Sequence, residues 1–180
     1  MSNASTRTAV IISHLSRLAG LLLCLLSLGA CSGGYSFTGA SIPPEAKTIS
    51  ISTFPNYAST VNPQLSQKLT EDLRDMFASQ TSLTVKDGSG DLELSGEITA
   101  YTTRPSAISS GDEASMYRLS ITIKVKFVNN VDPKANFEQS FTRYRDYNAA
   151  LNFASVENGL MSEIVAELCE DVFNKSVVNW

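Results

Sequence analysis

The chain has 180 residues, of which 43% are hydrophobic and 18% are charged, and its formal net charge is −4. This length suits one domain of ordinary size, and the acidic balance gives no electrostatic basis for nucleic-acid binding. The only histidine is His14, in a segment that we expect to be removed. A mature chain without histidine excludes Ser-His-Asp and Cys-His catalysis and any metal site built on histidine.

Residues 1–30 have the composition of a secretory signal peptide. Arg7 and Arg17 supply positive charge, no acidic residue occurs before Glu45, and an apolar run extends from Leu18 to Leu26. This run is too short to cross a bilayer, which takes about 20 apolar residues in a helix. An uncleaved membrane anchor is the alternative interpretation. Cleavage would leave 12 basic and 18 acidic side chains, hence a net charge of −6.

The segment Leu28-Gly29-Ala30-Cys31 resembles a bacterial lipobox, with an aliphatic residue and two small residues before a cysteine. We therefore expect Cys31 to be lipidated, with fatty acyl groups such as palmitate. Each buried methylene contributes about 0.8 kcal/mol, so several chains anchor a protein without a spanning helix. The following residues, Ser32-Gly33-Gly34, contain no aspartate, so the enterobacterial signal for inner-membrane retention is absent. The predicted location is the outer membrane, facing the periplasm.

Residues 31–46 are rich in serine, glycine and proline, which predicts a lipid-anchored tether. A single α+β domain is expected over residues 47–180. With Cys24 in the leader and Cys31 lipidated, Cys169 is left alone, so no intramolecular disulfide is expected. Acidic neighbours and apolar surroundings predict that Cys169 is a core side chain and not a reactive thiol.

The first predicted elements are a strand and a helix. Residues 47–54 are rich in β-branched side chains and predict a strand. Asn62 is then expected to cap a helix whose first residue is Pro63 and which ends near residue 79. Apolar side chains recur at helical spacing and predict one buried face. They are Leu65, Leu69, Leu73, Met76 and Phe77.

The middle of the chain predicts β-structure. Residues 83–85 could pair locally. Residues 92–100 alternate between apolar and polar side chains, which predicts a strand. Gly96 lies on the apolar face of this strand, where a bulge or a close backbone approach is expected. A loop is predicted over residues 104–113. The clearest alternation lies between Tyr117 and Phe127, and a further strand is expected at residues 136–147.

Ser155 is expected to cap a last helix that ends near Val177. The order β-α-β-β-β-α predicts an α+β fold, with a four-stranded, mostly antiparallel sheet and both helices on one face. The other face then meets water or a partner. We expect the cationic side chains of the last two strands on it, either as a solvated face or as a contact surface. They are Arg118, Lys124, Lys126, Arg143 and Arg145.

An enzymatic role finds little support in the sequence. Glu93 and Glu97 share a strand face, and Asp112-Glu113 adds two carboxylates. Paired carboxylates suit general acid/base chemistry, but no pocket signature accompanies them. No glycine-rich phosphate loop and no spacing of metal ligands occurs. We expect no catalytic residues, no metal and no cofactor.

Taken in order, several segments resemble the LPS-assembly lipoprotein family LptE. They are the lipobox cysteine Cys31, Tyr35-Ser36-Phe37, Ile42-Pro43-Pro44, the strand at 47–51, the helix led by Asn62-Pro63, and residues 92–98. The ending, residues 165–180, resembles the form found in Bacteroidetes. The resemblance covers residues 31–180.

The resemblance implies a lipoprotein that plugs the β-barrel LptD, assists its assembly, and helps lipopolysaccharide to reach the outer leaflet. Because lipopolysaccharide carries anionic phosphates, a cationic strand face would suit it. The alternative is a scaffold or activator lipoprotein of a cell-wall synthase or a secretion pore, because a fold does not determine a function.

Overall fold

The computed structural model describes residues 42–108 and 114–177. The chain divides into two units, Met1–Phe37 and Thr38–Trp180, and all described residues belong to the second. The predicted signal peptide, Cys31, most of the tether and Asp112-Glu113 lie outside the described residues, so the predictions made for them stay predictions. No helix in the described part of the chain combines the length and apolar character needed to cross a membrane.

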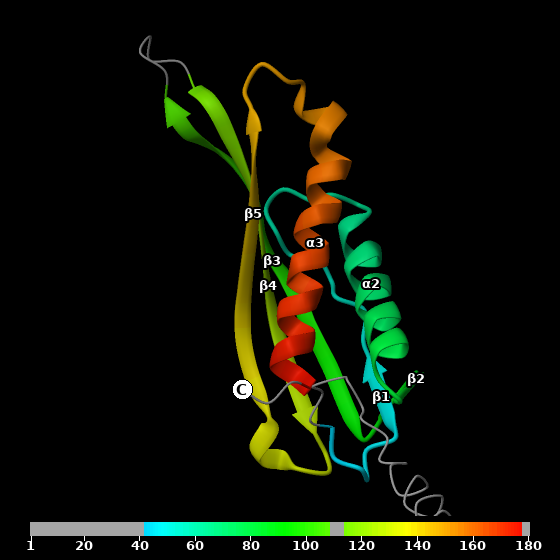
Figure 1. The fold of residues 1–180 in the computed structure, drawn as a ribbon. Coiled ribbons are helices and arrows are strands. Elements are labelled where there is room, and N and C mark those ends of the chain that lie inside the picture. Colours follow the sequence, from blue (N-terminus) through cyan, green and yellow to red (C-terminus); the bar gives the residue numbers. More distant parts are fainter. Residues whose placement is uncertain (1–41, 109–113, 178–180) are drawn as a thin grey trace, which may run out of the picture. The chain divides into compact units, whose positions relative to one another are not determined.

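The described residues form one five-stranded sheet in the order β2-β1-β3-β4-β5 (Figure 1). Its strands are β1 (Thr48–Ile51), β2 (Thr84–Lys86), β3 (Leu92–Ile108), β4 (Ala114–Asn129) and β5 (Phe137–Asn148). β3, β4 and β5 pair antiparallel, whereas β1 pairs parallel with both β2 and β3. The prediction of four mostly antiparallel strands was therefore wrong in strand number and pairing. Residues 83–85 were expected to pair locally, but residues 84–86 pair in parallel with β1, because three residues are too few for an alternation pattern that would indicate their partner.

The two helices, α2 (Leu65–Gln80) and α3 (Phe153–Val177), lie together over one face of the sheet, as predicted (Figure 1). The rings of Phe77 on α2 and Phe173 on α3 meet edge to face, with centroids 5.1 Å apart. Asn62 does act at the helix start: its Oδ1 accepts a hydrogen bond from the Gln64 amide at 2.9 Å. The helix proper begins at Leu65 and not at Pro63, because Pro63 and Gln64 form a turn.

Gly96 allows a close approach between layers. A Cβ at this position would overlap the carbonyl oxygen of Lys124 and lie 2.5 Å from Cε1 of Phe54. The expected close approach is thus confirmed. A register irregularity follows between Ile98 and Ala100. It shifts the alternation by one residue, so Tyr101, and not Ala100 as expected, is buried in the core.

Residues 104–108 continue β3 and do not form the predicted loop. Pro105 pairs with Tyr117 of β4, and register irregularities lie between Pro105 and Ala107 and between Ala107 and Ile108. A proline is tolerated at a free strand edge because its missing N–H would otherwise point to solvent. In the described residues β1 pairs with β3 only as far as Leu94, so Pro105 lies on such an edge. The sequence suggested a loop because a proline usually interrupts a strand.

Candidate functional site

The face of the sheet opposite the helices, which we call the open face, is the main candidate site. Cross-strand partners point to the same side of a sheet, so the strand pairing shows which residues lie on the open face. β4 contributes Arg118, Ser120, Thr122, Lys124 and Lys126, as the alternation predicted. β3 contributes Glu93, Glu97 and Arg104, and β5 contributes Glu138, Thr142, Tyr144 and Asp146.

Near the end of β3 and the start of β4, Arg118 is held in a fixed position on the open face. Its guanidinium donates two hydrogen bonds to Asp146, at 2.8 and 2.9 Å. Its Cζ lies 3.7 Å from the centroid of the Tyr144 ring, an arrangement that adds cation–π attraction. The hydrogen bond from Asp146 raises the pKa of Arg118, and the same bond lowers the pKa of Asp146. Arg118 therefore presents a pre-oriented cation beside an exposed aromatic ring.

Towards the other end of the open face, Lys124 pairs with a carboxylate of the neighbouring strand. Its Nζ lies 2.5 Å from Oε1 of Glu138. This hydrogen bond raises the pKa of Lys124 and lowers that of Glu138. Lys126 forms no ion pair with any residue that the structure describes. A shallow hollow of about 320 Å³ lies between these side chains, over the backbone of Gly96 and Val125.

Arg143 and Arg145 lie on the other face, with the helices. Their register partners on β4 are Ile121 and Leu119, two core residues. Arg143 Nη2 lies 2.5 Å from Asp171 Oδ1.

Arg145 is bound twice by α3. It donates to Glu163 at 2.7 Å and to Glu167 at 2.6 Å, and these hydrogen bonds raise its pKa. The placement of Arg143 and Arg145 on the open face was therefore wrong. They alternate in phase with Phe141 and Tyr147, which are buried. Because β5 is an edge strand, it can carry long polar side chains on its helix side.

The open face is not basic as a whole. On β3, β4 and β5 its four cations, Arg104, Arg118, Lys124 and Lys126, face four carboxylates, Glu93, Glu97, Glu138 and Asp146. Sequence reasoning missed Arg104, which lies opposite Arg118 in the β3–β4 register, because residue 104 was assigned to a loop. It also missed Tyr144, which is 48% exposed. The alternation of β5 could have indicated Tyr144, since it shares a phase with Thr142 and Asp146.

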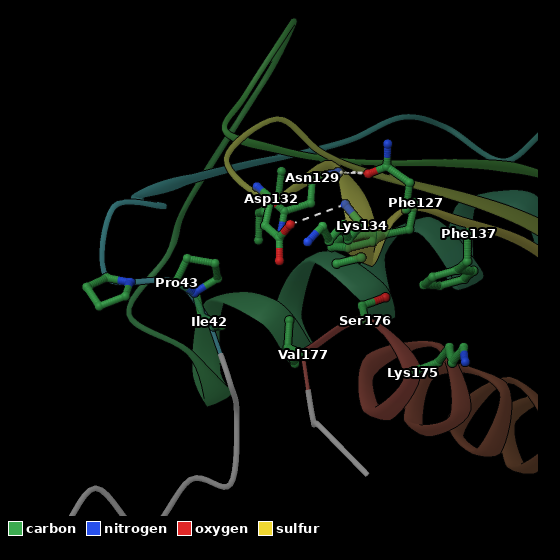
Figure 2. Close-up of a pocket in the computed structure, with 14 residues that line it drawn as sticks. Ile42, Pro43, Phe127, Asn129, Asp132, Lys134, Phe137, Lys175, Ser176 and Val177 are labelled. Atoms are coloured by element: carbon green, nitrogen blue, oxygen red, sulfur yellow. Dashed lines mark hydrogen bonds between the residues drawn. The ribbon is translucent and has the colours of Figure 1, made fainter.

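A second hollow, of about 480 Å³, lies beside the connection between β4 and β5 (Figure 2). Ile42, Phe127, Phe137 and Val177 line its apolar part. Its polar lining includes Asp132, Lys134, Asn136 and Lys175. The segment before β1 and the end of α3 thus meet at one place.

The described residues contain no group of three or more side chains suited to hold a metal ion. Glu93 and Glu97 share the open face, and Glu97 lies opposite Lys124. Cys169 is buried in α3, as expected, and burial raises the pKa of its thiol to about 12. The thiol is therefore protonated at neutral pH, a state that is not nucleophilic.

Residues 46–176 match the model of the lipopolysaccharide-assembly family LptE. No curated protein matches the chain by sequence. Among solved structures, a minor lipoprotein from Acinetobacter baumannii is 15% identical, with a TM-score of 0.48, over 72% of this chain and 91% of that one. Rare lipoprotein B from Shewanella oneidensis is 12% identical, with a TM-score of 0.47, over 71% and 89%.

The hypothetical protein CT253 from Chlamydia trachomatis is 8% identical to this chain, with a TM-score of 0.53. The similarity covers 74% of this chain and 99% of that one. At this identity it supports the fold alone.

Proposed function

The chain belongs to the lipopolysaccharide-assembly family LptE, and from this membership we propose that it is an outer-membrane lipoprotein that plugs and helps to assemble an LptD-like β-barrel. In this role it assists the transport of lipopolysaccharide to the outer leaflet. The family match over residues 46–176 is the observation that carries the proposal. The partners are the barrel, lipopolysaccharide, and the outer membrane through lipid on Cys31.

The open face supports a role by contact and not by catalysis. Arg118 is oriented by Asp146 beside the exposed ring of Tyr144. Arginine binds phosphate through paired hydrogen bonds, and tyrosine and arginine are enriched among the residues that dominate protein interfaces. Arg104, opposite Arg118, and Lys126 extend this set. Arg143 and Arg145 are engaged by α3, so we leave them out of it.

Purification from membranes in mild detergent tests the role of the whole protein. We expect mass spectrometry to find acyl groups on Cys31 and a β-barrel to co-elute. Co-elution of a peptidoglycan synthase or a secretion pore would instead favour a scaffold or activator lipoprotein. An unmodified Cys31 thiol would contradict the lipid anchor.

Charge reversal tests the open face. We expect Lys124→Glu with Lys126→Glu to weaken lipopolysaccharide binding several-fold, because both changes place anions where phosphate would bind. The matched control is Lys134→Glu with Lys175→Glu, which makes the same change in net charge at the hollow shown in Figure 2. Unchanged binding by the open-face variant would remove both lysines from the site.

A photoreactive residue in place of Thr122 tests which molecule docks. Thr122 lies at mid-strand on the open face, with its Oγ1 2.9 Å from that of Thr142. An adduct with the barrel would show that the open face docks the partner, and an adduct with lipid would show that this face contacts lipopolysaccharide.

A further inference from the structure

Two segments that lead into the helices contain no charged residue. They are residues 52–67, between β1 and the first turn of α2, and residues 147–156, from the end of β5 to the first turn of α3. In a chain with 18% charged residues, 26 uncharged positions in two such segments are unusual. Neither helix has an acidic residue in its first turn, although a helix N-terminus favours one. We call these two segments together the uncharged end.

The two segments lie at the same end of the sheet (Figure 1). Asn62 Nδ2 donates to Glu157 Oε1 at 2.8 Å, which joins the start of α2 to the start of α3. Glu157 also accepts a hydrogen bond from the Tyr101 hydroxyl at 2.6 Å. The first charged side chain after the second segment, Glu157, therefore has one carboxylate oxygen engaged within the fold.

Three large apolar side chains are exposed at the uncharged end. Tyr57 is 69% exposed, Val61 59% and Leu151 50%. Lone exposed apolar residues are common, but here they coincide with a local absence of charge. Interface centres have this composition: they are depleted in charged residues and enriched in aromatic ones.

Both loops are held by their own hydrogen bonds. The Tyr57 amide donates to Ile98 O at 2.9 Å, and Asn56 Oδ1 accepts from the Ala58 amide at 3.0 Å. The Leu151 amide donates to Asn148 O at 3.0 Å, in the second loop. The exposed side chains are thus presented on ordered backbone, and a surface ordered in advance loses less conformational entropy on binding.

We propose that the uncharged end is a docking surface for an uncharged protein surface that offers apolar and hydrogen-bonding groups. The inference rests on the proposed function, in which the occupant is the barrel partner. A surface that binds an anionic bilayer would carry lysine or arginine, and neither segment contains one.

The position of the uncharged end also favours a protein over the bilayer. The 25 residues of α3 extend about 37 Å at 1.5 Å per residue. Its last residue, Val177, shares a hollow with Ile42, at the point where the predicted tether enters the domain. The uncharged end therefore lies at the far end of α3 from the attachment of the tether.

The test is co-purification of the full lipidated chain with its barrel partner. We expect Val61→Asp with Leu151→Asp to reduce recovery of the barrel at least tenfold, because two unpaired carboxylates would be buried in the contact. The matched control is Val131→Asp, which is also exposed (38%) but lies in the turn after β4. It should recover as much barrel as the wild type, and both variants should keep the wild-type thermal midpoint.

Other outcomes separate this inference from the proposed function. A wild-type chain that recovers no barrel overturns the proposed function and this inference with it. Equal recovery by wild type and the Val61→Asp, Leu151→Asp variant overturns the inference alone. A photoreactive residue in place of Leu151 avoids any effect on folding: an adduct with the barrel supports the inference, whereas an adduct with lipid or a second copy of the chain overturns it.

Discussion

At the scale of single residues, two positions hold neighbouring segments of this domain close together: a glycine without a side chain and an aspartate whose carboxylate is hydrogen-bonded. Gly96 leaves room for the Phe54 ring. Asp91 joins the starts of β1 and β3, because its Oδ2 accepts hydrogen bonds from the Lys47 and Thr48 amides, both at 2.9 Å. These bonds lower the pKa of Asp91. Such positions tolerate few substitutes.

We predict that Gly96→Ala destabilises the protein by about 1–3 kcal/mol, because the new methyl group would force the Lys124 backbone and the Phe54 ring apart. The control is Gly159→Ala in α3, where a Cβ meets nothing within 4 Å. It should stabilise the helix by about 0.5–1 kcal/mol. Urea unfolding measures both changes, and equal stability of the two variants would contradict the expected cost of filling the space at Gly96.

At the scale of elements, the edge strand β5 is fastened to α3 by ion pairs on its helix side. Arg143 pairs with Asp171, and Arg145 with Glu163 and Glu167. The carboxylates are spaced four residues apart, so they follow one face of α3. The alternation of β5 directs Arg143 and Arg145 to the helix side, and the ion pairs hold them there.

We predict a small, salt-dependent coupling between Arg145 and Glu167. A double-mutant cycle with Arg145→Ala and Glu167→Ala should give about 0.5–1 kcal/mol, because both side chains are partly exposed. Urea unfolding in low salt and in about 1 M NaCl provides the measurement, and screening should reduce the coupling. A coupling that does not change with salt would mean that packing, and not charge, joins the two elements.

At the scale of the whole molecule, one core spans both helices and the sheet. Cys169 of α3 is fully buried within it. Because the core is shared, we expect the thiol to become accessible only when the whole domain unfolds.

We predict that, with Cys24→Ser and Cys31→Ser in place, Cys169 does not react with a thiol reagent at pH 7 in the folded state. The reaction should begin in step with loss of the helical circular-dichroism signal as urea is raised. The matched control is an added exposed cysteine, Ser79→Cys on α2, which should react without denaturant. Labelling of Cys169 well below the unfolding midpoint would reveal local opening of α3.

Local patterns in the sequence predicted most elements of this fold. The alternation from Tyr117 to Phe127 assigned the two faces of β4 correctly, and the apolar repeat from Leu65 to Phe77 identified the buried face of α2. Periodicity of this kind reflects which side of an element avoids water, and each segment carries that information by itself. The family resemblance was likewise readable from order and spacing, and the family match over residues 46–176 confirms it.

Only the tertiary structure decided how the segments pair and which cationic side chains can contact a partner at the open face. β2 exists because β1 offers it a parallel edge, and residues 104–108 remain a strand because β4 continues beside them. Arg143 and Arg145 face α3, and the uncharged end forms where two loops distant in sequence meet. These outcomes depend on contacts between segments that are far apart in the sequence. The energies of such contacts cannot be inferred from a local sequence pattern.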